Sequence, residues 1–268
     1  MTRSIFDLSG EVVIITGSSG LLGFEYSKAV IQNHGKVIGI DIVENENSKY
    51  LKAKFPNSFS FIKADITKKL ELIDALIKIK EIFGEPTALV NNAAIDNPPL
   101  NDSITGCFEE ISEESWDEVN NVNLKGVFLA CQVFGSEFAS NKRGNIINIS
   151  SIYGLVSPDQ SMYDSINKDK KRFFKPAAYS VTKSGILNFT RYLAEYWAKD
   201  NIRVNTLTLA GVKGNQDKDF LIKYKQRIPM GRMAESHEYS GAIVFLLSNA
   251  SSYMTGSNLI IDGGWTAI

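Results

Sequence analysis

The sequence predicts an α/β fold in which a doubly wound, seven-stranded parallel sheet carries helices on both faces. Short runs rich in β-branched residues alternate with longer stretches of helical periodicity, which is the pattern of successive strand–helix–strand units. No proline- or glycine-rich linker and no internal repeat divides the 268 residues. Because α/β folds commonly reach this length as one unit, we expect residues 1–268 to form a single domain.

Seven short apolar runs are the expected strands, and the clearest helix lies between the third and the fourth. The strands are Val12–Thr16, Lys36–Ile40, Ser58–Ile62, Ala88–Asn91, Asn145–Ser150, Arg203–Leu207 and Asn258–Ile261. From Glu71 to Phe83, apolar residues recur at steps of three and four, so this helix should lay one face on the sheet. The residues of that face are Leu72, Ala75, Leu76, Ile79 and Phe83.

Two segments interrupt this alternation. The first, from Asp96 to Glu110, contains two consecutive prolines, and the second, from Val156 to Pro176, contains a cluster of basic residues. Each follows a strand that should end on the ligand side of the sheet, where open α/β folds bind their substrates. We therefore expect 156–176 to be an inserted substrate loop.

The composition excludes several classes of function. Hydrophobic residues make up 44% and charged residues 22% of the chain, as in a soluble globular protein. A net charge of −1 supplies no basic field for a nucleic acid. The two cysteines and two histidines lack metal-ligand spacing, so we expect no metal site. The start lacks signal-peptide features and no apolar run is long enough to span a membrane, which predicts a cytoplasmic protein without a membrane partner.

A glycine-rich turn follows the first expected strand. Gly17, Gly20 and Gly23 have the spacing GxxGxxG, and a helical pattern begins directly after them. Glycine permits both the tight turn and the close approach of a pyrophosphate to backbone N–H groups at the start of a helix. This turn therefore predicts a dinucleotide site, although by itself it could be an ordinary loop.

Asp41 ends the second strand, about 20 residues beyond the glycines. An acidic residue at this point accepts hydrogen bonds from the adenosine ribose of NAD. Its carboxylate would repel the 2′-phosphate of NADP, and neither Ser18 nor Ile42 offers a compensating positive charge. We therefore expect NAD rather than NADP, against the alternative of a surface aspartate that merely closes a strand.

An ordered set of motifs covers almost the whole chain and resembles the short-chain dehydrogenase/reductase family, whose members have a Rossmann-type fold. The motifs are Gly17–Gly23, Asp65-Ile66, Asn91-Asn92-Ala93-Ala94, VNLKGVF around Asn123, INISSIYG around Ser151, Tyr179-Ser180-Val181-Thr182-Lys183, Ile202-Arg203-Val204-Asn205, Thr255-Gly256 and Ile261-Asp262-Gly263-Gly264. YxxxK alone is common by chance, whereas this ordered set is highly specific.

The resemblance implies a role for each matching position. It implies a catalytic tetrad of Asn123, Ser151, Tyr179 and Lys183. Asp65 and Ile66 would flank the adenine, Asn92 would lie beside the ribose, and the backbone of Val212 would hold the carboxamide, whereas Asn91 would be structural. With the turn and Asp41, the implied cofactor contacts are Gly17, Ser19, Gly20, Leu22, Gly23, Asp41, Asp65, Ile66, Asn92, Tyr179, Lys183 and Val212.

The chemistry of Tyr179 and Lys183 supports these roles independently. Removing a hydride from a carbinol requires a base for the hydroxyl proton, and the reverse reaction requires the same group as an acid. Bringing a tyrosine pKa from near 10 toward 7 requires roughly 4 kcal/mol of phenolate stabilisation, which a nearby ammonium can partly supply. Lys183 lies one helical turn after Tyr179, so both side chains can project from one face. Ser151 would orient the substrate oxygen, and Asn123 would hold a water on the proton path.

The chain departs from the family pattern in three places. Its glycine spacing resembles the branch that contains nucleotide-sugar epimerases and dehydratases. The Pro-Gly after the sixth strand appears as Leu209-Ala210 before Gly211-Val212, so the Val212 contact is the least secure. Ser151 and Tyr179 are 28 positions apart, which indicates an insertion. The inserted Tyr163 lacks a lysine four residues later, so we reject it as the proton carrier, although it could touch substrate.

Close before Tyr179, the insertion carries five basic residues that surround only one acid, Asp169. This cluster could clamp a phosphate or carboxylate, or it could be a solvated loop. The insertion, the GSSGLLG turn and GNQDKDFL also resemble family members of bacterial surface-sugar and nonulosonic-acid pathways, which makes a phosphorylated or nucleotide-linked sugar the first substrate class. The basic residues are Lys168, Lys170, Lys171, Arg172 and Lys175.

The leading hypothesis is a dehydrogenase or reductase that interconverts a secondary alcohol and a ketone with NAD(H). The alternatives are an NAD-retaining sugar epimerase or dehydratase, a 3-oxoacyl thioester reductase, a polyol dehydrogenase, and an NAD-binding sensor or scaffold without catalysis. The family resemblance also implies a homodimer or homotetramer. The apolar residues near the YxxxK motif could form the contacts between subunits, or they could belong to the core of the monomer. They are Phe189, Tyr192, Leu193, Tyr196 and Trp197.

Overall fold

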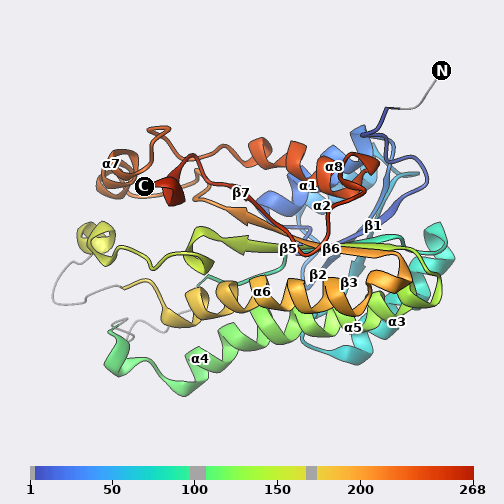
Figure 1. Ribbon diagram of the computed structural model, residues 1–268, viewed down its shortest axis with the longest axis horizontal. Helices are drawn as coiled ribbons and strands as arrows, with labels where there is room; N and C mark the ends of the chain where they lie inside the picture. Colours follow the sequence, from blue (N-terminus) through green and yellow to red (C-terminus); the bar gives the residue numbers. More distant parts are fainter. Residues whose placement is uncertain (1–3, 97–106, 167–173) are drawn as a thin grey trace.

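The computed structural model describes residues 4–96, 107–166 and 174–268 and contains the predicted parallel sheet (Figure 1). Its strands are hydrogen-bonded in the order β3-β2-β1-β4-β5-β6-β7, so the direction of winding reverses between β1 and β4. Open α/β sheets bind ligands at this kind of switch point. The strands are β1 (Val12–Thr16), β2 (Lys36–Asp41), β3 (Phe59–Lys63), β4 (Ala88–Asn91), β5 (Gly144–Ser151), β6 (Ile202–Leu209) and β7 (Asn258–Ile261).

The predicted α/β class and all seven strands are confirmed, and the strands that are more than one residue longer than expected are β5 and β6. Both strands are longer than expected because they pair with each other in parallel from Gly144 and Ile202 to Ser151 and Leu209. This pairing extends β5 as far as Ser151, which the sequence placed just after the strand. The predicted helix after β3 is α3 (Lys69–Phe83), which begins two residues earlier than expected.

Helices cover both faces of the sheet (Figure 1). Because strand side chains alternate between faces, Ile14 packs into the core on one side and Val13 and Ile15 into the core on the other. As predicted, α3 buries Leu72, Ala75 and Ile79. The first face carries α3, α4 (Glu113–Asn120), α5 (Val127–Ser140) and α6 (Ala177–Tyr196), and the second carries α1 (Leu21–Gln32), α2 (Glu46–Lys54) and α8 (Ser240–Leu247).

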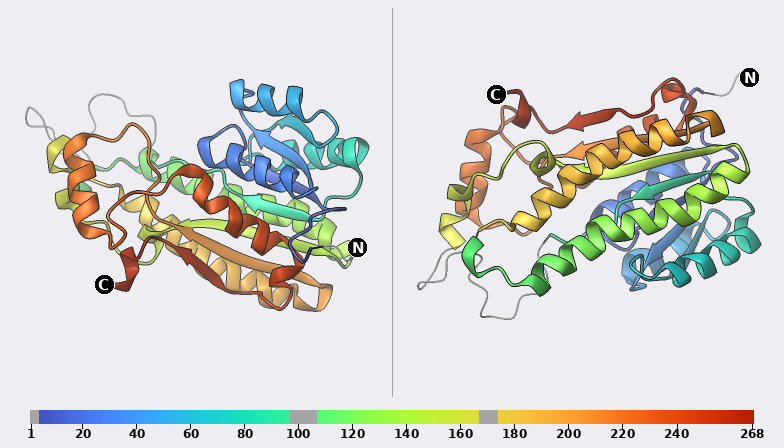
Figure 2. Two further views of the ribbon diagram at one scale, coloured as in Figure 1. Left: turned by 90° about the horizontal axis from the view of Figure 1, so that it is seen from above. Right: turned by 60° about the horizontal axis from the view of Figure 1, so that its bottom comes forward.

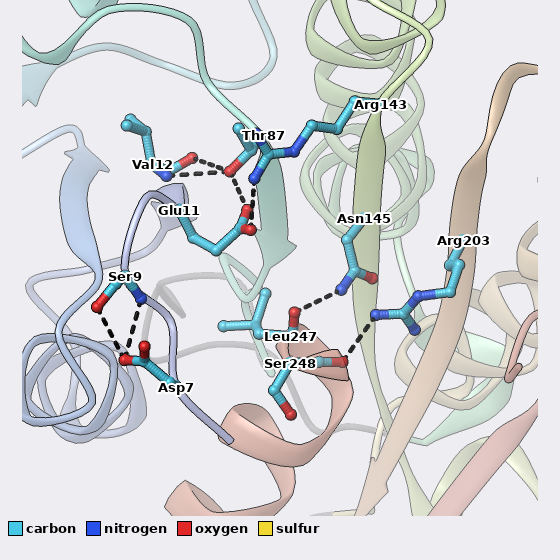
Figure 3. A network of polar contacts seen from close by, with 10 residues as sticks. All are labelled: Asp7, Ser9, Glu11, Val12, Thr87, Arg143, Asn145, Arg203, Leu247 and Ser248. Atoms are coloured by element: carbon cyan, nitrogen blue, oxygen red, sulfur yellow. Dashed lines mark hydrogen bonds and ion pairs between the residues drawn. The ribbon is translucent and has the colours of Figure 1, made fainter. Parts of the chain in front are cut away.

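Polar contacts join the amino ends of the strands (Figure 3). The Glu11 carboxylate, just before β1, accepts hydrogen bonds from Thr87 before β4 and Arg143 before β5. Asn145 on β5 and Arg203 on β6 donate to main-chain carbonyls at the end of α8. These contacts leave the opposite, carboxyl edge of the sheet to ligands.

At the carboxyl ends of β5 and β6, α7 (Lys218–Arg227) lies beside the C-terminal segment (Figure 2). The Tyr224 ring lies 4.8 Å from the Trp265 ring, and its hydroxyl accepts a hydrogen bond from the Gly211 amide at 2.8 Å. A separate apolar cluster forms here and also contains Tyr153 and Tyr163. This cluster builds the outer wall of the cavity described below.

The predicted insertion is described at 156–166 and 174–176. Four of its basic residues, Lys168, Lys170, Lys171 and Arg172, lie outside the described residues, whereas Lys175 lies inside them. Within the described ranges, none of the helices is both long and apolar enough to cross a membrane.

Candidate active site

Two adjoining cavities run along the carboxyl edge of the sheet. One, of about 780 Å³, lies beside Asp41, and the other, of about 690 Å³, lies beside Tyr179. We call them the Asp41 cavity and the Tyr179 cavity. Their walls share four residues, so together they form one continuous cleft. The shared residues are Leu22, Asn92, Ala94 and Val212.

The glycine turn shapes the floor of the Asp41 cavity. Gly17 has a left-handed backbone with φ of 65°, and a Cβ on it would lie 2.8 Å from the Cα of Ala93. A Cβ on Gly23 would lie only 2.3 Å from the Gly17 carbonyl oxygen. Gly17 therefore allows the turn, whereas Gly23 allows α1 to pack directly on it.

The amino end of α1 opens into this cavity. Gly20 caps the helix without a side-chain hydrogen bond, and Gly20, Leu21 and Leu22 all line the cavity. The first N–H groups of a helix have no intrahelical partner and carry a partial positive charge. The first turn of α1 can therefore receive a phosphate group.

Ser19 and Asn92 support the turn from outside. The Ser19 amide donates to the Asp41 carboxylate at 3.1 Å, and its hydroxyl donates to the Val43 carbonyl at 2.6 Å. The Asn92 side chain donates to the carbonyls of Thr16 and Gly17, each at 3.1 Å. Ser19 is absent from the residues that line either cavity, as is Gly23, whereas Asn92 lines both.

The lining of the Asp41 cavity is acidic. Asp41, Asp65 and Glu118 line it, and no Lys, Arg or His is present among the described lining residues. Asp41 also accepts a hydrogen bond from the Ile42 amide at 2.8 Å, which fixes its carboxylate at the end of β2. Partial burial would raise the pKa of Asp65, but hydrogen bonds from Thr67 and the nearby Lys68 ammonium keep it below the usual range. Ile66 lines the same cavity.

Tyr179, Lys183 and Ser151 meet in the Tyr179 cavity. The first two lie on α6, one helical turn apart, and the Lys183 ammonium lies 5.7 Å from the centre of the Tyr179 ring. Ser151 ends β5, and the Ser150 hydroxyl beside it donates to the Lys183 carbonyl at 2.8 Å. This bond fixes α6 against β5, so three side chains from two elements face one space.

Burial dominates the electrostatics of this group. It lowers the pKa of Lys183 to about 8, although the Asp96 carboxylate acts in the opposite direction. It also raises the pKa of Tyr179 strongly, and Asp96 adds to that increase, whereas a hydrogen bond with Ser151 opposes it. In the free protein Tyr179 is therefore a neutral phenol, the form that donates a proton.

The side chain of Asn123 is fully engaged within the protein. It lies in a π-helical turn, Asn121–Gly126, between α4 and α5. Its amide donates to the Ile95 carbonyl and its oxygen accepts from the Ile95 amide, both at 2.9 Å, and it also contacts Thr182 on α6 at 3.3 Å. Asn123 thus joins the end of β4 to the catalytic helix.

Val212 lies where the two cavities meet, and its carbonyl accepts a hydrogen bond from the Gln216 side chain at 2.8 Å. Asn91 lies inside the sheet instead, where its amide donates to Asn148 at 2.8 Å. The cleft therefore brings Ser151, Tyr179 and Lys183 together, whereas Asn123 is not among its lining residues. Of the predicted cofactor contacts, Ser19 and Gly23 are also absent from that lining, and the others line it.

Sequence reasoning missed Tyr153 and Asp96 beside Tyr179, and it expected Tyr163 only as a residue that could touch substrate. Tyr153 and Tyr163 both line the cavity, and their hydroxyls lie 3.2 Å apart. Asp96 also lines it and forms an ion pair with Lys175, the one basic residue of the insertion that is described. Tyr153 follows Ser151 by two positions and Asp96 ends the Asn91–Asp96 run, but neither carries a distinctive motif.

Comparison with known proteins agrees with this geometry. The family model described as enoyl-(acyl carrier protein) reductase matches residues 18–266. Post-translational flagellin modification protein A of Campylobacter coli is 34% identical, with 96% of this chain and 99% of that protein covered. The 2-dehydro-3-deoxy-D-gluconate 5-dehydrogenase of Escherichia coli is 32% identical over the full length of both chains.

A solved structure shows the same fold. The short-chain dehydrogenase of Leptospira borgpetersenii, with bound NAD⁺, superposes with a TM-score of 0.86 at 33% identity and covers 99% of this chain and 97% of its own. The cleft, the ordered motifs and these relatives agree in one assignment. The chain belongs to the short-chain dehydrogenase/reductase family, whose fold binds a nicotinamide cofactor and whose members interconvert CH–OH and C=O groups.

Proposed function

We propose that this protein is an NAD(H)-dependent oxidoreductase that interconverts a secondary alcohol and a ketone on a sugar-like substrate. One observation carries the proposal: Tyr179, Lys183 and Ser151 face a cavity that is continuous with the one beside Asp41. A dinucleotide that extends along the cleft would bring its nicotinamide to the Tyr179 phenol.

The residues of the Asp41 cavity fit NAD. The uncapped first turn of α1 can hold the pyrophosphate, and the carboxylate of Asp41 can accept hydrogen bonds from ribose hydroxyls. Because the described lining residues of this cavity include three acids and no base, a 2′-phosphate beside Asp41 would meet like charge. This supports NAD over NADP.

In the proposed mechanism, a nicotinamide bound beside Tyr179 would supply or accept the hydride at the carbinol carbon. Ser151 donates a hydrogen bond to the substrate oxygen and orients it beside the Tyr179 hydroxyl. In alcohol oxidation, the Tyr179 phenolate takes the hydroxyl proton while the C–H bond breaks, and in reduction the phenol returns it. The Lys183 ammonium, 5.7 Å from the Tyr179 ring centre, stabilises the phenolate.

Asn123 acts in this mechanism by positioning. Its side chain is occupied by Ile95 and Thr182, so a water on the proton path from Lys183 would bind the main chain of the π-helical turn. π-Helical turns are frequent at functional sites because they disrupt the regular carbonyl ladder. This proposal replaces a side-chain role for Asn123 with a main-chain role.

The first substrate class that we propose is a phosphorylated or nucleotide-linked sugar. The names of two relatives support a sugar-related substrate, since one modifies flagellin and the other acts on 2-dehydro-3-deoxy-D-gluconate. A 3-oxoacyl thioester or a simple polyol would use the same proton transfer, so the substrate panel must include all three classes.

The decisive experiment follows absorbance at the NADH band with that panel, for the wild type and for Tyr179→Phe. We expect Tyr179→Phe to lower kcat by at least about a thousandfold, because the proton carrier is lost, while the Kd of NADH stays within about twofold. Tyr253→Phe is the matched control because this tyrosine is fully exposed, and it should retain full activity.

The alternatives give different results in the same experiment. An epimerase or dehydratase would convert substrate without a net change in NADH, and a sensor or scaffold would bind NADH without turnover. Robust turnover by Tyr179→Phe would overturn the proposed mechanism.

We also propose a homodimer or homotetramer formed through the outer face of α6. Tyr192 and Tyr196 are 61% and 62% exposed, and their rings stack 6.0 Å apart. Leu193 and Trp197 are buried in the core instead, and Phe189 packs against it, so these three belong to the monomer. Light scattering tests this proposal, and a monomer at micromolar concentration would contradict it.

A further inference from the structure

Lys175 places a second ammonium in the Tyr179 cavity. Its side chain is only 10% exposed, and its Nζ lies 4.9 Å from the centre of the Tyr179 ring and 5.8 Å from that of Tyr153. Two cations, Lys175 and Lys183, are present among the described residues that line this cavity. Because Lys183 donates to the Ile149 carbonyl at 3.0 Å deep in the fold, Lys175 is the cation that faces an incoming substrate.

The backbone of Lys175 is fixed in position. Its amide donates to the Gln160 side-chain oxygen at 2.8 Å, and its carbonyl accepts from the Gln160 side-chain nitrogen at 3.4 Å. Two residues later α6 begins, which ties Lys175 to the helix that carries Tyr179. The ammonium is therefore held at a defined place relative to the reacting hydroxyl, as a recognition group must be.

The two members of the Lys175–Asp96 ion pair differ in exposure. The Asp96 side chain is 54% exposed, whereas that of Lys175 is 10% exposed. A buried ammonium requires a counter-ion, because leaving a charge unpaired in a protein interior is costly. A half-exposed carboxylate, by contrast, can return to water at little cost. An entering anion can thus take the place of Asp96 without leaving either charge unsatisfied.

We propose that Lys175 is a specificity-determining residue that binds an oxyanion, a carboxylate or a phosphate, carried by the substrate. Asp96 holds the ammonium in place in the free site and gives way to the substrate. This inference rests on the proposed function for the identity of the reacting end of the substrate, but the binding step requires no catalysis.

A matched set of six-carbon polyols tests the proposal. D-Gluconate carries a carboxylate, D-glucitol 6-phosphate carries a phosphate, and D-glucitol is the neutral counterpart. Calorimetry on the NADH complex measures their Kd values without turnover, because an alcohol cannot be oxidised when the cofactor is already reduced. We expect at least one of the two anions to bind the wild type at least tenfold more tightly than D-glucitol, and the preferred anion identifies the oxyanion.

The variants have opposite expected effects. Lys175→Met should raise the Kd of the preferred anion at least tenfold and change the Kd of D-glucitol by less than twofold. Lys175→Arg should restore much of the lost anion affinity. Asp96→Asn should tighten the anion severalfold, because it removes the internal competitor for the ammonium. Lys80→Met is the control. It removes a lysine on α3 that pairs with Glu137 on α5 at 2.8 Å, and it should change none of these Kd values.

Three outcomes would overturn the proposal. The first is a wild type that binds neither anion more tightly than D-glucitol. The second is an equal loss of affinity for all three ligands in both Lys175→Met and Asp96→Asn, as expected of a purely structural ion pair. The third is a changed pH profile with the neutral substrate in Lys175→Met, which would assign Lys175 to Tyr179 instead. Absence of hydride transfer with every substrate would contradict the proposed function but not the proposal that Lys175 binds an oxyanion.

Discussion

Replacing Lys183 with methionine should stabilise the protein while it abolishes activity. Burial lowers the pKa of Lys183 from 10.5 to about 8. At about 1.4 kcal/mol per pH unit, holding the charged ammonium in the fold at pH 7 costs about 3 kcal/mol. Met has a similar length and carries no charge, so Lys183→Met removes this cost. Losing the hydrogen bond to the Ile149 carbonyl destabilises the variant by about 1 kcal/mol, which offsets part of this gain.

The pH dependence separates the charge effect from the hydrogen bond. Since the folded pKa is depressed, the unfolded chain binds more protons between pH 8 and 10.5, and wild-type stability rises across that window. The free-energy cost of burying the Lys183 ammonium is fully present below pH 8 and disappears above pH 10.5. The stability difference between Lys183→Met and the wild type should therefore shrink by about 2 kcal/mol from pH 7 to pH 9.5.

Urea denaturation of the cofactor-free proteins at equal concentration measures this difference. Lys78→Met, on the exposed face of α3, is the control and should show no such pH dependence. A difference that stays constant between pH 7 and pH 9.5 would refute the inference that Lys183 is buried as a charged group at neutral pH.

Two further predictions concern the cofactor cavity. Gly23→Ala should destabilise the fold by about 1–3 kcal/mol and weaken NADH binding, because its Cβ would lie 2.3 Å from the Gly17 carbonyl oxygen. Gly241→Ala is the control: its Cβ would meet no atom within 4 Å, so the free energy of unfolding should be unchanged or raised. Equal effects of the two substitutions in urea denaturation would refute the packing argument. Asp41→Asn keeps an acceptor for the Ser19 amide but removes the charge, so the ratio of NADPH to NADH affinity should rise at least about tenfold in fluorescence titrations; an unchanged ratio would contradict the proposed basis for NAD preference.

The sequence was sufficient for the sheet because its signals are local. Buried parallel strands show as β-branched runs wherever they occur, and all seven were found. The glycine turn, Asp41 and the Tyr179–Lys183 pair were also recognisable, because their spacing follows from one turn or one helix. Strand ends were less certain, since β5 extends to Ser151 only through its pairing with β6.

The tertiary structure alone decided which of these side chains can reach a ligand. Asn123 matched its motif, yet its side chain is occupied by the Ile95 backbone. Ser19 likewise faces Val43 rather than the cleft. Hydrogen bonds between residues far apart in the chain cannot be inferred from the spacing of a motif, because the partner is set by how the elements pack.

Lys175 shows both what the sequence could predict and what only the fold could decide. The sequence identified it as one of five basic residues close before Tyr179 and could not distinguish it from its neighbours. The fold brings Asp96, five residues beyond the end of β4, against its ammonium and places that ammonium beside the Tyr179 ring. The sequence by itself thus determined the fold class and the family and predicted Tyr179 as the proton carrier, whereas the contact between Lys175 and Asp96 was decided only by chain packing, because it joins segments about 80 residues apart.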